Sequence, residues 1–298
     1  MADYDYIIVG AGSAGCVLAE RLSASGRHRV LVLEAGGSDR RFYVQMPLGY
    51  GKLLYDPGVN WCYHTEPEPG LAGQRDYWPR GKLLGGSSSI NAMVYIRGHP
   101  EDYEAWQAAG NSGWGWADVL QAFKAMEHNE AGAGDLRGTG GPLHITTNLG
   151  DLHPLCLAFF AAAQAAGLPY NPDFNGPAQE GVGPYQLTVK NGRRLSAARA
   201  FLRPAMGRPN VTVLTQARVT RVLFDGRHAT GVAYRRHGRD QVAFARGEVI
   251  LAGGAINSPQ LLQLSGIGPA DLLRSLGIEV ICDNPNVGAQ LSDHLGLN

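Results

Sequence analysis

The sequence lacks clustered cysteines, long apolar runs and an excess of charge of either sign. Its four cysteines are isolated and form no C-x-x-C pair, so neither a zinc ribbon nor a redox dithiol is indicated. Lys+Arg and Asp+Glu both number 26, which argues against a polybasic binder of nucleic acid or anionic membranes. No apolar run approaches the roughly 18 residues of a membrane span.

No secretory signal precedes the first predicted strand, because the chain starts Met-Ala-Asp-Tyr-Asp and enters that strand at once. We therefore expect a cytoplasmic protein with reduced, free thiols. We also expect no metal site, no nucleic-acid partner and no membrane span. No internal repeat of about 20 to 50 residues is present.

Glycine, in contrast, is abundant at 41 of 298 residues, about twice its usual share. The glycines follow no Gly-X-Y period, which excludes collagen. They cluster in short turns, as expected where the backbone must approach a ligand closely. Apolar residues make up 44% of the chain, enough for a sizeable core.

The N-terminal segment has the pattern of a strand, a helix and a second strand. Residues 4–9 and 29–34 are short apolar runs, and residues 16–22 have helical spacing. Between them, Gly10-Ala11-Gly12-Ser13-Ala14-Gly15 matches G-x-G-x-x-G. In this motif the glycines allow a tight turn, close approach of a diphosphate, and close packing of helix on strand.

Glu34 ends the second of these strands. A carboxylate at this place accepts hydrogen bonds from ribose hydroxyls and repels a 2′-phosphate. The glycine motif and the acid together predict a dinucleotide-binding site. They do not decide between FAD and NAD.

The remaining pattern is mixed. Residues 36–98 show little periodicity and predict long loops of the kind that wrap a ligand. Helices are predicted over 101–109, 117–127 and 152–166. Strands are predicted over 211–214, 217–224, 230–235, 241–245 and 248–252, with a hairpin at Asp225-Gly226 and a helix opening at Asn257.

A second glycine cluster, Gly81-Lys82-Leu83-Leu84-Gly85-Gly86-Ser87-Ser88-Ser89-Ile90-Asn91, presents many backbone donors. Such a loop can wrap a diphosphate or a flavin ring, or it can be a surface linker. It is not a Walker loop, because no G-K-[ST] closes it, and it contains no G-x-S-x-G nucleophile elbow.

Two long segments resemble signatures of the glucose-methanol-choline (GMC) flavin oxidoreductases. Residues 81–98 resemble the first signature, and residues 254–268 resemble the second. Residues 174–176, 194–202 and 287–294 are also similar to that family. The resemblance covers essentially the whole chain and is closest to the bacterial choline dehydrogenase and alcohol dehydrogenase branch.

The resemblance implies an α/β fold: a Rossmann-like FAD-binding domain with an inserted α+β substrate domain, incomplete at the C-terminus. Residues 1–141 would form the first part of the FAD-binding domain and residues 205–298 its second part. Residues 142–204 would begin the substrate-binding domain.

The resemblance also implies FAD as the cofactor. Some relatives attach FAD covalently through a histidine at the position of Ile90, so binding here is expected to be noncovalent. Carried over by position, the cofactor-binding residues are Gly10, Gly12, Ser13, Ala14, Gly15, Glu34, Ala35, Leu83, Gly86, Ser87, Asn91, Ala92, Met93, Val94 and Val219.

The implied function is oxidation of a choline-like or other primary alcohol by hydride transfer to flavin N5. Electrons would pass to a quinone, to another acceptor or to oxygen. The family's catalytic base is a histidine near the C-terminus, helped by a second histidine or an asparagine, and none of the nine histidines here has that context. The catalytic residues are therefore unassigned and expected in a missing C-terminal segment or a partner chain. His294 is interpreted as structural, and His99 as a loop residue or a neighbour of substrate.

Three alternatives stay open. The chain is a hydroxynitrile lyase on the same scaffold, a noncatalytic FAD-binding fragment or half of a split enzyme, or an NAD dehydrogenase, which the second signature disfavours. If a C-terminal part is missing, we expect exposed apolar surface and a tendency to aggregate. Trp106, Trp114 and Trp116 are interpreted as packing residues, with an aromatic cage for choline as the other possibility.

Overall fold

The computed structural model describes residues 3–147 and 152–293. Its contacts divide the chain into two compact units. Unit 1 comprises Met1–Val44, Gly49–Ile90 and Ser196–Asn298, and unit 2 comprises Gln45–Leu48 and Asn91–Leu195. Residues 91–141 thus group with 142–195, whereas the expected division places a boundary at residue 141. That division by function stays a prediction.

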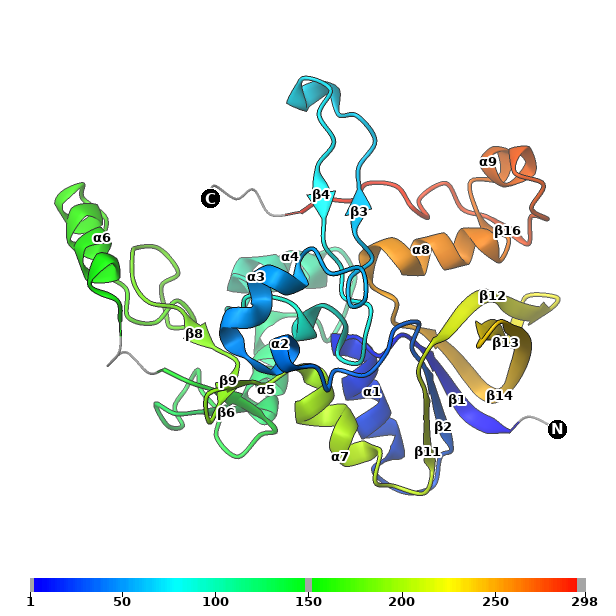
Figure 1. Cartoon of the computed structure of the whole chain (residues 1–298), viewed down its shortest axis with the longest axis horizontal. Coiled ribbons are helices and arrows are strands. Elements are labelled where there is room, and N and C mark those ends of the chain that lie inside the picture. Colours follow the sequence, from blue (N-terminus) through cyan, green and yellow to red (C-terminus); the bar gives the residue numbers. More distant parts are fainter. Residues whose placement is uncertain (1–2, 148–151, 294–298) are drawn as a thin grey trace. The chain divides into compact units, whose positions relative to one another are not determined.

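Unit 1 is built on a six-stranded sheet (Figure 1) in the order β11-β2-β1-β14-β13-β12. The first strands and the end of β14 pair in parallel, and the last three strands pair antiparallel. The strands are β1 Tyr4–Val9, β2 Val30–Leu33, β11 Val211–Leu214, β12 Ala217–Asp225, β13 His228–Arg236 and β14 Arg239–Leu251. The predicted hairpin is confirmed, because Asp225 pairs with His228 across the turn.

β14 replaces two predicted strands by one. Its first half pairs antiparallel with β13, and its second half pairs parallel with β1. The register shifts between the two halves, where Tyr4 pairs with Ala245 and Tyr6 with Glu248. A Cβ on Gly247 would lie 2.8 Å from the Asp5 carbonyl oxygen, so a glycine at this irregularity lets the strand continue into its new pairing.

The predicted β-α-β unit is present. Its helix, α1 (Ser13–Ser23), begins directly after Gly12 and packs against residues 198–205 of unit 1. A Cβ on Gly15 would lie 1.9 Å from the Gly10 carbonyl oxygen. Only glycine therefore allows α1 to lie this close to the turn that precedes it.

Helix α8 (Gly254–Leu264) begins three residues earlier than the predicted opening at Asn257. Gly253 is its N-cap, and the Gly253 backbone N–H donates to the Ser258 hydroxyl at 3.1 Å. Pro259 consequently lies inside the helix. The sequence analysis was wrong here because it took the polar residues before the proline as the cap, whereas the glycine turn performs that role.

Two apolar clusters hold unit 1 together. One lies on the sheet and includes Ile7, Val9, Leu31, Leu33, Ala217, Val222, Val232, Tyr234, Ala243, Ala245 and Leu261. The other lies among the loops and consists of Val44, Leu53, Val59, Leu83 and Ile90. Full burial of such aliphatic side chains contributes about 1.5–3 kcal/mol each, which is what orders loops that have little regular structure.

The loop region contains only short elements, as predicted. They are α2 Phe42–Gln45, η1 Pro47–Gly49, α3 Tyr50–Leu53, β3 Tyr63–His64, η2 Pro69–Leu71, β4 Tyr77–Trp78 and η3 Gly86–Ser89. The chain between β3 and β4 forms a long projection from unit 1 (Figure 1). Unit 1 ends with β15 Ile267–Gly268, α9 Ala270–Ser275 and β16 Cys282–Asp283.

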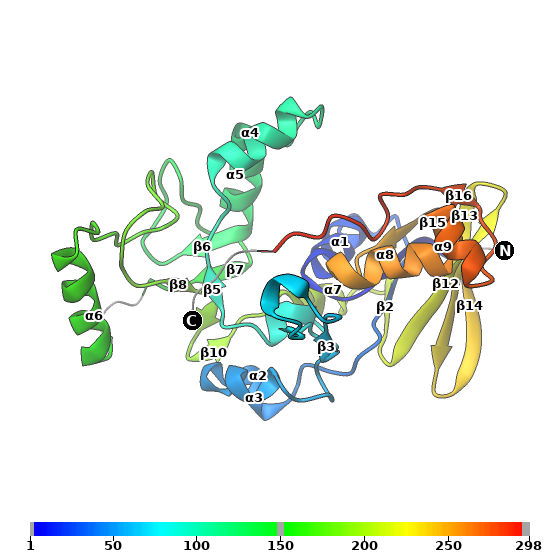
Figure 2. The same ribbon diagram turned by 90° about the horizontal axis from the view of Figure 1, so that it is seen from above.

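Unit 2 is a mixture of helices and short strands (Figure 2). The three predicted helices are confirmed within one or two residues. The elements are β5 Val94–Tyr95, α4 Pro100–Ala108, α5 Trp116–Met126, β6 Glu127–Asn129, β7 Leu143–Ile145, α6 Pro154–Ala165, β8 Gln186–Leu187, β9 Val189–Lys190 and β10 Arg193–Arg194. Trp106 and Trp114 meet edge to face with ring centroids 5.9 Å apart, and both are half-exposed.

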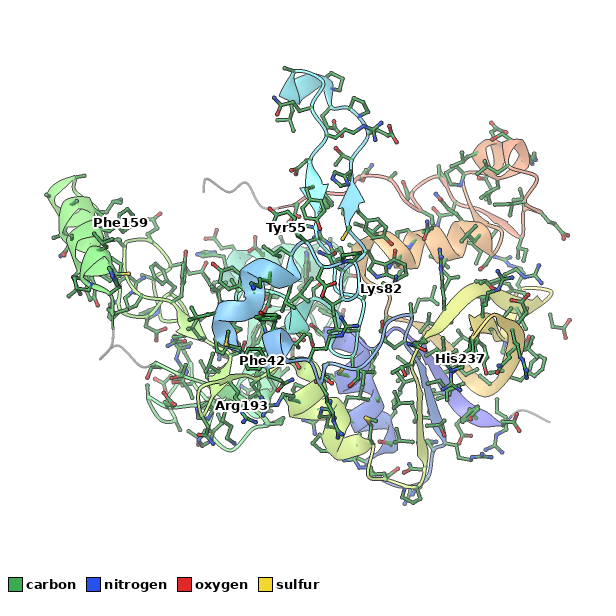
Figure 3. All side chains as sticks on the ribbon, viewed as in Figure 1. Phe42, Tyr55, Lys82, Phe159, Arg193 and His237 are labelled. Atoms are coloured by element: carbon green, nitrogen blue, oxygen red, sulfur yellow. The ribbon has the colours of Figure 1, made fainter. Side chains whose placement is uncertain are left out.

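Helix α6 leaves large apolar side chains uncovered within the described residues. Leu155, Leu157 and Phe159 are all more than half exposed, and Figure 3 labels Phe159 at this helix. The surface expected to be exposed by a missing C-terminal part, and the expected tendency to aggregate, both stay predictions. Within residues 3–147 and 152–293, no helix combines the length and the apolarity that a membrane crossing requires.

Candidate cofactor site

A cavity of about 830 Å³ opens in unit 1. It is lined by the ends of β1 and β2, the first turns of α1 and α8, the start of β12 and the second glycine cluster. Its volume lies within the roughly 300–1,000 Å³ of typical small-molecule sites. Its place at the carboxyl ends of parallel strands is where α/β sheets bind their ligands.

Two glycines make the floor of the cavity possible. Gly10 has φ +100°, and a Cβ there would lie 2.6 Å from the Ala252 carbonyl oxygen. Gly86 has φ +53°, and a Cβ there would lie 2.7 Å from Cα of Gly12. A side chain at either position would push apart the two backbone segments that meet here. The cavity thus presents bare backbone to a ligand.

Two helices begin at the cavity. Ser13 and Ala14 of α1, and Gly254 to Asn257 of α8, are among its lining residues. Neither α1 nor α8 has a side-chain hydrogen bond at its N-cap. The first-turn N–H groups of a helix have no partner within the helix, and together with the helix dipole they favour anionic ligands. The arrangement suits a diphosphate.

Glu34 is the carboxylate of the cavity and is only 6% exposed. Its Oε2 accepts the Ala11 N–H and its Oε1 accepts the Gly36 N–H, both at 2.8 Å. Burial raises the pKa of Glu34 to about 6, although these two hydrogen bonds and the charge of Lys82 act in the opposite direction. The carboxylate is thus held in one orientation and keeps lone pairs for a hydroxyl donor.

The second glycine cluster closes one side of the cavity. The Gly85 N–H donates to the Ala11 carbonyl at 2.7 Å, and the Gly81 N–H donates to the Ser87 hydroxyl at 3.1 Å. Gly86 is buried, and Gly86 and Ser87 line the cavity. The alternative of a surface linker is therefore wrong for this segment.

The structure brings together many of the residues expected to bind the cofactor. Those that line the cavity are Gly10, Gly12, Ser13, Ala14, Glu34, Ala35, Gly86, Ser87 and Val219. Gly15 lies beneath the turn and Leu83 is fully buried in the loop cluster. Asn91, Ala92, Met93 and Val94 belong to unit 2, where the Asn91 side chain accepts from the Met93 N–H and from Arg194. His294 lies outside the described residues.

The sequence analysis assigned no role to several lining residues. They are Trp61, Arg80, Arg218, Thr220 and Arg235, together with the first turns of α8. The second family signature points to the start of α8, so that signal was present in the sequence. The tryptophan and the arginines belong to no motif and meet the cavity only through tertiary structure.

The fold and the cavity define a dinucleotide-binding α/β protein. Residues 4–296 match the profile of the GMC oxidoreductase family. The chain belongs to the GMC oxidoreductases, so the resemblance seen in the sequence is confirmed, and with it the FAD-binding fold of that family.

Three known proteins show the extent of the likeness. The mitochondrial choline dehydrogenase of Homo sapiens is 51% identical over 98% of this chain and 50% of its own length. The alcohol dehydrogenase (acceptor) of Pseudomonas putida is 51% identical over 99% of this chain and 54% of its own. A solved FAD-dependent oxidoreductase from Chaetomium thermophilum is 34% identical, with a TM-score of 0.87 over 95% of this chain and 51% of its own. The chain spans about half the length of the relatives it matches, and the family supports FAD as the dinucleotide.

Proposed function

We propose that the cavity binds FAD noncovalently and that this chain provides the cofactor site of an enzyme that oxidises a primary alcohol, choline or a similar one. The family and its choline and alcohol dehydrogenase relatives support this direction. The observation that carries the proposal is the joint lining of one cavity by the Gly10–Ala14 turn, Glu34 and Gly86.

The residues present fit the cofactor. The bare backbone at Gly10, Gly12 and Gly86 leaves room for a diphosphate, with the starts of α1 and α8 directed at its charge. Glu34 would accept the ribose hydroxyls. Ala35 and Val219 would contact the adenine, and Leu83 together with Asn91 to Val94 would contact the flavin.

Noncovalent attachment follows from the position of Ile90. Its side chain is 2% exposed and belongs to the apolar loop cluster with Val44, Leu53, Val59 and Leu83. An aliphatic side chain offers no atom that bonds to a flavin methyl group. FAD would be held by hydrogen bonds, charge and packing alone.

When bound, FAD would supply, at its N5 atom, the acceptor for the hydride that leaves the carbinol carbon. The residues of this chain bind and orient the cofactor. Among the described residues that line the cavity there is no histidine. We assign the base that takes the hydroxyl proton to the part of the relatives' length that this chain does not span. A quinone or oxygen would then reoxidise the flavin.

The cofactor proposal is tested by loading the purified chain with FAD and recording its visible spectrum before and after acid precipitation. Flavin bands that move into the supernatant support noncovalent FAD. Flavin retained in the pellet contradicts the argument from Ile90, and a chain that retains no FAD after loading contradicts the cofactor site. Glu34→Ala should lose flavin, whereas the exposed Glu248→Ala, which does not line the cavity, should retain it.

The alcohol proposal is tested by combining the loaded chain with the C-terminal half of the Pseudomonas putida relative. Anaerobic bleaching of the flavin by choline or another primary alcohol supports alcohol oxidation. Release of cyanide from a hydroxynitrile without bleaching contradicts it and supports a lyase.

A further inference from the structure

Arg194 is a buried arginine of unit 2 to which the proposed function gives no role. It lies in β10, opposite Val189 of β9, and is only 1% exposed. Burial lowers the pKa of Arg194 to about 10, so its guanidinium stays charged near neutral pH. Burying a cation is costly unless its N–H groups are hydrogen-bonded. The groups that accept from Arg194 therefore indicate what it does.

Two of these acceptors belong to Asn91. Nη1 of Arg194 donates to the Asn91 main-chain carbonyl at 2.6 Å and to Oδ1 of its side chain at 2.9 Å. The same Oδ1 accepts the Met93 N–H at 3.1 Å. Because both partners are donors, the amide oxygen of Asn91 must face them and the amide nitrogen must face the other way. Asn91 is exposed, and within residues 3–147 and 152–293 its Nδ2 donates no hydrogen bond.

The turn that follows Asn91 is held in place as well. Met93 has φ +64° and is 4% exposed, and a residue other than glycine keeps such a φ only when its surroundings support it. The N–H and the hydroxyl of Thr188 donate to the Met93 carbonyl at 2.9 and 3.2 Å. Met93 is thus the buried anchor of a short segment in which Asn91, Ala92 and Val94 are exposed.

We propose that Arg194 is a positioning residue that fixes the Asn91 amide with its oxygen inward and its NH₂ group outward, so that Asn91 donates to an acceptor atom of the flavin ring. The inference rests on the proposed function, which gives the segment from Asn91 to Val94 the contact with the flavin. The flavin ring carries carbonyl oxygens and ring nitrogens that accept hydrogen bonds. An amide whose oxygen is already engaged offers such an edge two donors. Arg194 acts only through Asn91.

The sharpest test is Asn91→Asp. The aspartate can still accept from Arg194 and from the Met93 N–H, so a thermal melt should match that of the native chain or lie above it. Its second oxygen cannot donate, so FAD affinity, measured by quenching of flavin fluorescence, should fall at least tenfold. The visible absorption band of the flavin in the saturated variant should also shift, because this band responds to hydrogen bonds on the ring. A residue that only shapes the turn would leave both affinity and band unchanged.

The role of Arg194 is tested by a double-mutant cycle. Arg194→Met frees the Asn91 amide to rotate and should lower FAD affinity about tenfold, with a shift of the flavin band. Arg194→Lys keeps one charged donor and should retain part of the affinity. In the Asn91→Ala background, neither Arg194→Met nor Arg194→Lys should lower FAD affinity further. Losses that add in the double variants overturn the positioning role.

Arg193→Met is the matched control, because Arg193, labelled in Figure 3, is the exposed neighbour of Arg194 on the same strand. It should leave FAD affinity and the flavin band unchanged, and an effect equal to that of Arg194→Met overturns the inference. If Arg194→Met does not fold, Asn91→Asp and the cycle with Arg194→Lys decide. A native chain that binds FAD no better than Asn91→Asp does refutes this inference alone, whereas a native chain that binds no FAD also refutes the proposed function.

Discussion

Each unit contains a buried glutamate, and the two glutamates are used in opposite ways. In unit 2, Glu127 is fully buried, forms an ion pair with the Arg97 guanidinium at 2.8 Å, and accepts hydrogen bonds from the Tyr95 hydroxyl at 2.9 Å and the Gly138 N–H at 2.6 Å. In unit 1, Glu34 accepts two backbone N–H groups and faces a cavity. A buried carboxylate thus marks a binding site only when its protein partners leave oxygen lone pairs free to accept from a ligand.

The same contrast holds for the arginines. Arg97 lies over the Phe123 ring with its charge neutralised by Glu127, so the pair is complete in itself. Arg218 lies against the Trp61 ring, and no described carboxylate is at ion-pair distance from it. The first arrangement stabilises unit 2, and the second leaves the Arg218 guanidinium without a carboxylate partner among the described residues.

The largest effect on stability is expected from a substitution of Glu127. Glu127→Leu leaves the Arg97 guanidinium buried without its counter-ion, which should reduce the free energy of unfolding by about 3–5 kcal/mol. Denaturant titration measures the loss. The exposed Glu101→Gln should change stability little. Equal stability of the two variants would show that the Arg97–Glu127 pair is not structural.

Gly86→Ala tests the cradle of unit 1. The added Cβ meets Cα of Gly12 at 2.7 Å and the backbone stays at φ +53°, a strain on the order of 1–3 kcal/mol. FAD affinity, measured by quenching of flavin fluorescence on titration, should fall at least tenfold. Gly226→Ala has a similar φ of +58° with open space around it and lies away from the cavity, so it should lose some stability and no FAD affinity.

Glu34 should make both the stability of the chain and its affinity for FAD depend on pH. Its pKa is raised from 4.5 to about 6 by burial, so the folded chain without cofactor is favoured below about pH 4.5 and loses about 2 kcal/mol as pH rises through 6. Ribose hydroxyls donate to the ionised form, so FAD affinity should rise with pH through the same range. Titrations of FAD binding from pH 5 to about 8 check this. A Glu34→Gln variant with the same pH step would assign the step to another group.

The smallest effect is expected at His99. Its Nδ1 accepts the Glu101 N–H at 3.3 Å, and the Asp102 side chain accepts the His99 N–H at 3.0 Å, which completes a capping box at α4. His99→Ala should reduce stability by about 0.5–1 kcal/mol, while His99→Asn should retain most of it. A thermal melt compares the two. FAD affinity that changes with His99→Ala would contradict a purely structural role.

Local motifs made much of this structure predictable. The first β-α-β unit, the glycine turn and Glu34 follow from short-range spacing, because each residue acts on neighbours in sequence. The dual pairing of β14 did not follow, since its two halves are joined by a bulge that depends on Asp5 from the other end of the chain. Trp61 and Arg218 were missed for the same reason. They are far apart in the sequence, and only the tertiary structure brings them to one wall of the cavity.

The pairing of β1 with β14 has a consequence for biosynthesis. Val9 pairs with Leu251, and the Gly10 turn rests on Ala252, so during synthesis residues 9 and 10 wait for residues 251 and 252 to leave the ribosome. At about 5–20 residues per second this delay is on the order of ten to fifty seconds. Until then the edge of β1 that β14 will cover is unpaired. Unpaired strand edges are prone to aggregation, and chaperones protect them. Cofactor loading therefore follows the synthesis of β14, and nascent chains that end before β14 would be unable to take up the dinucleotide.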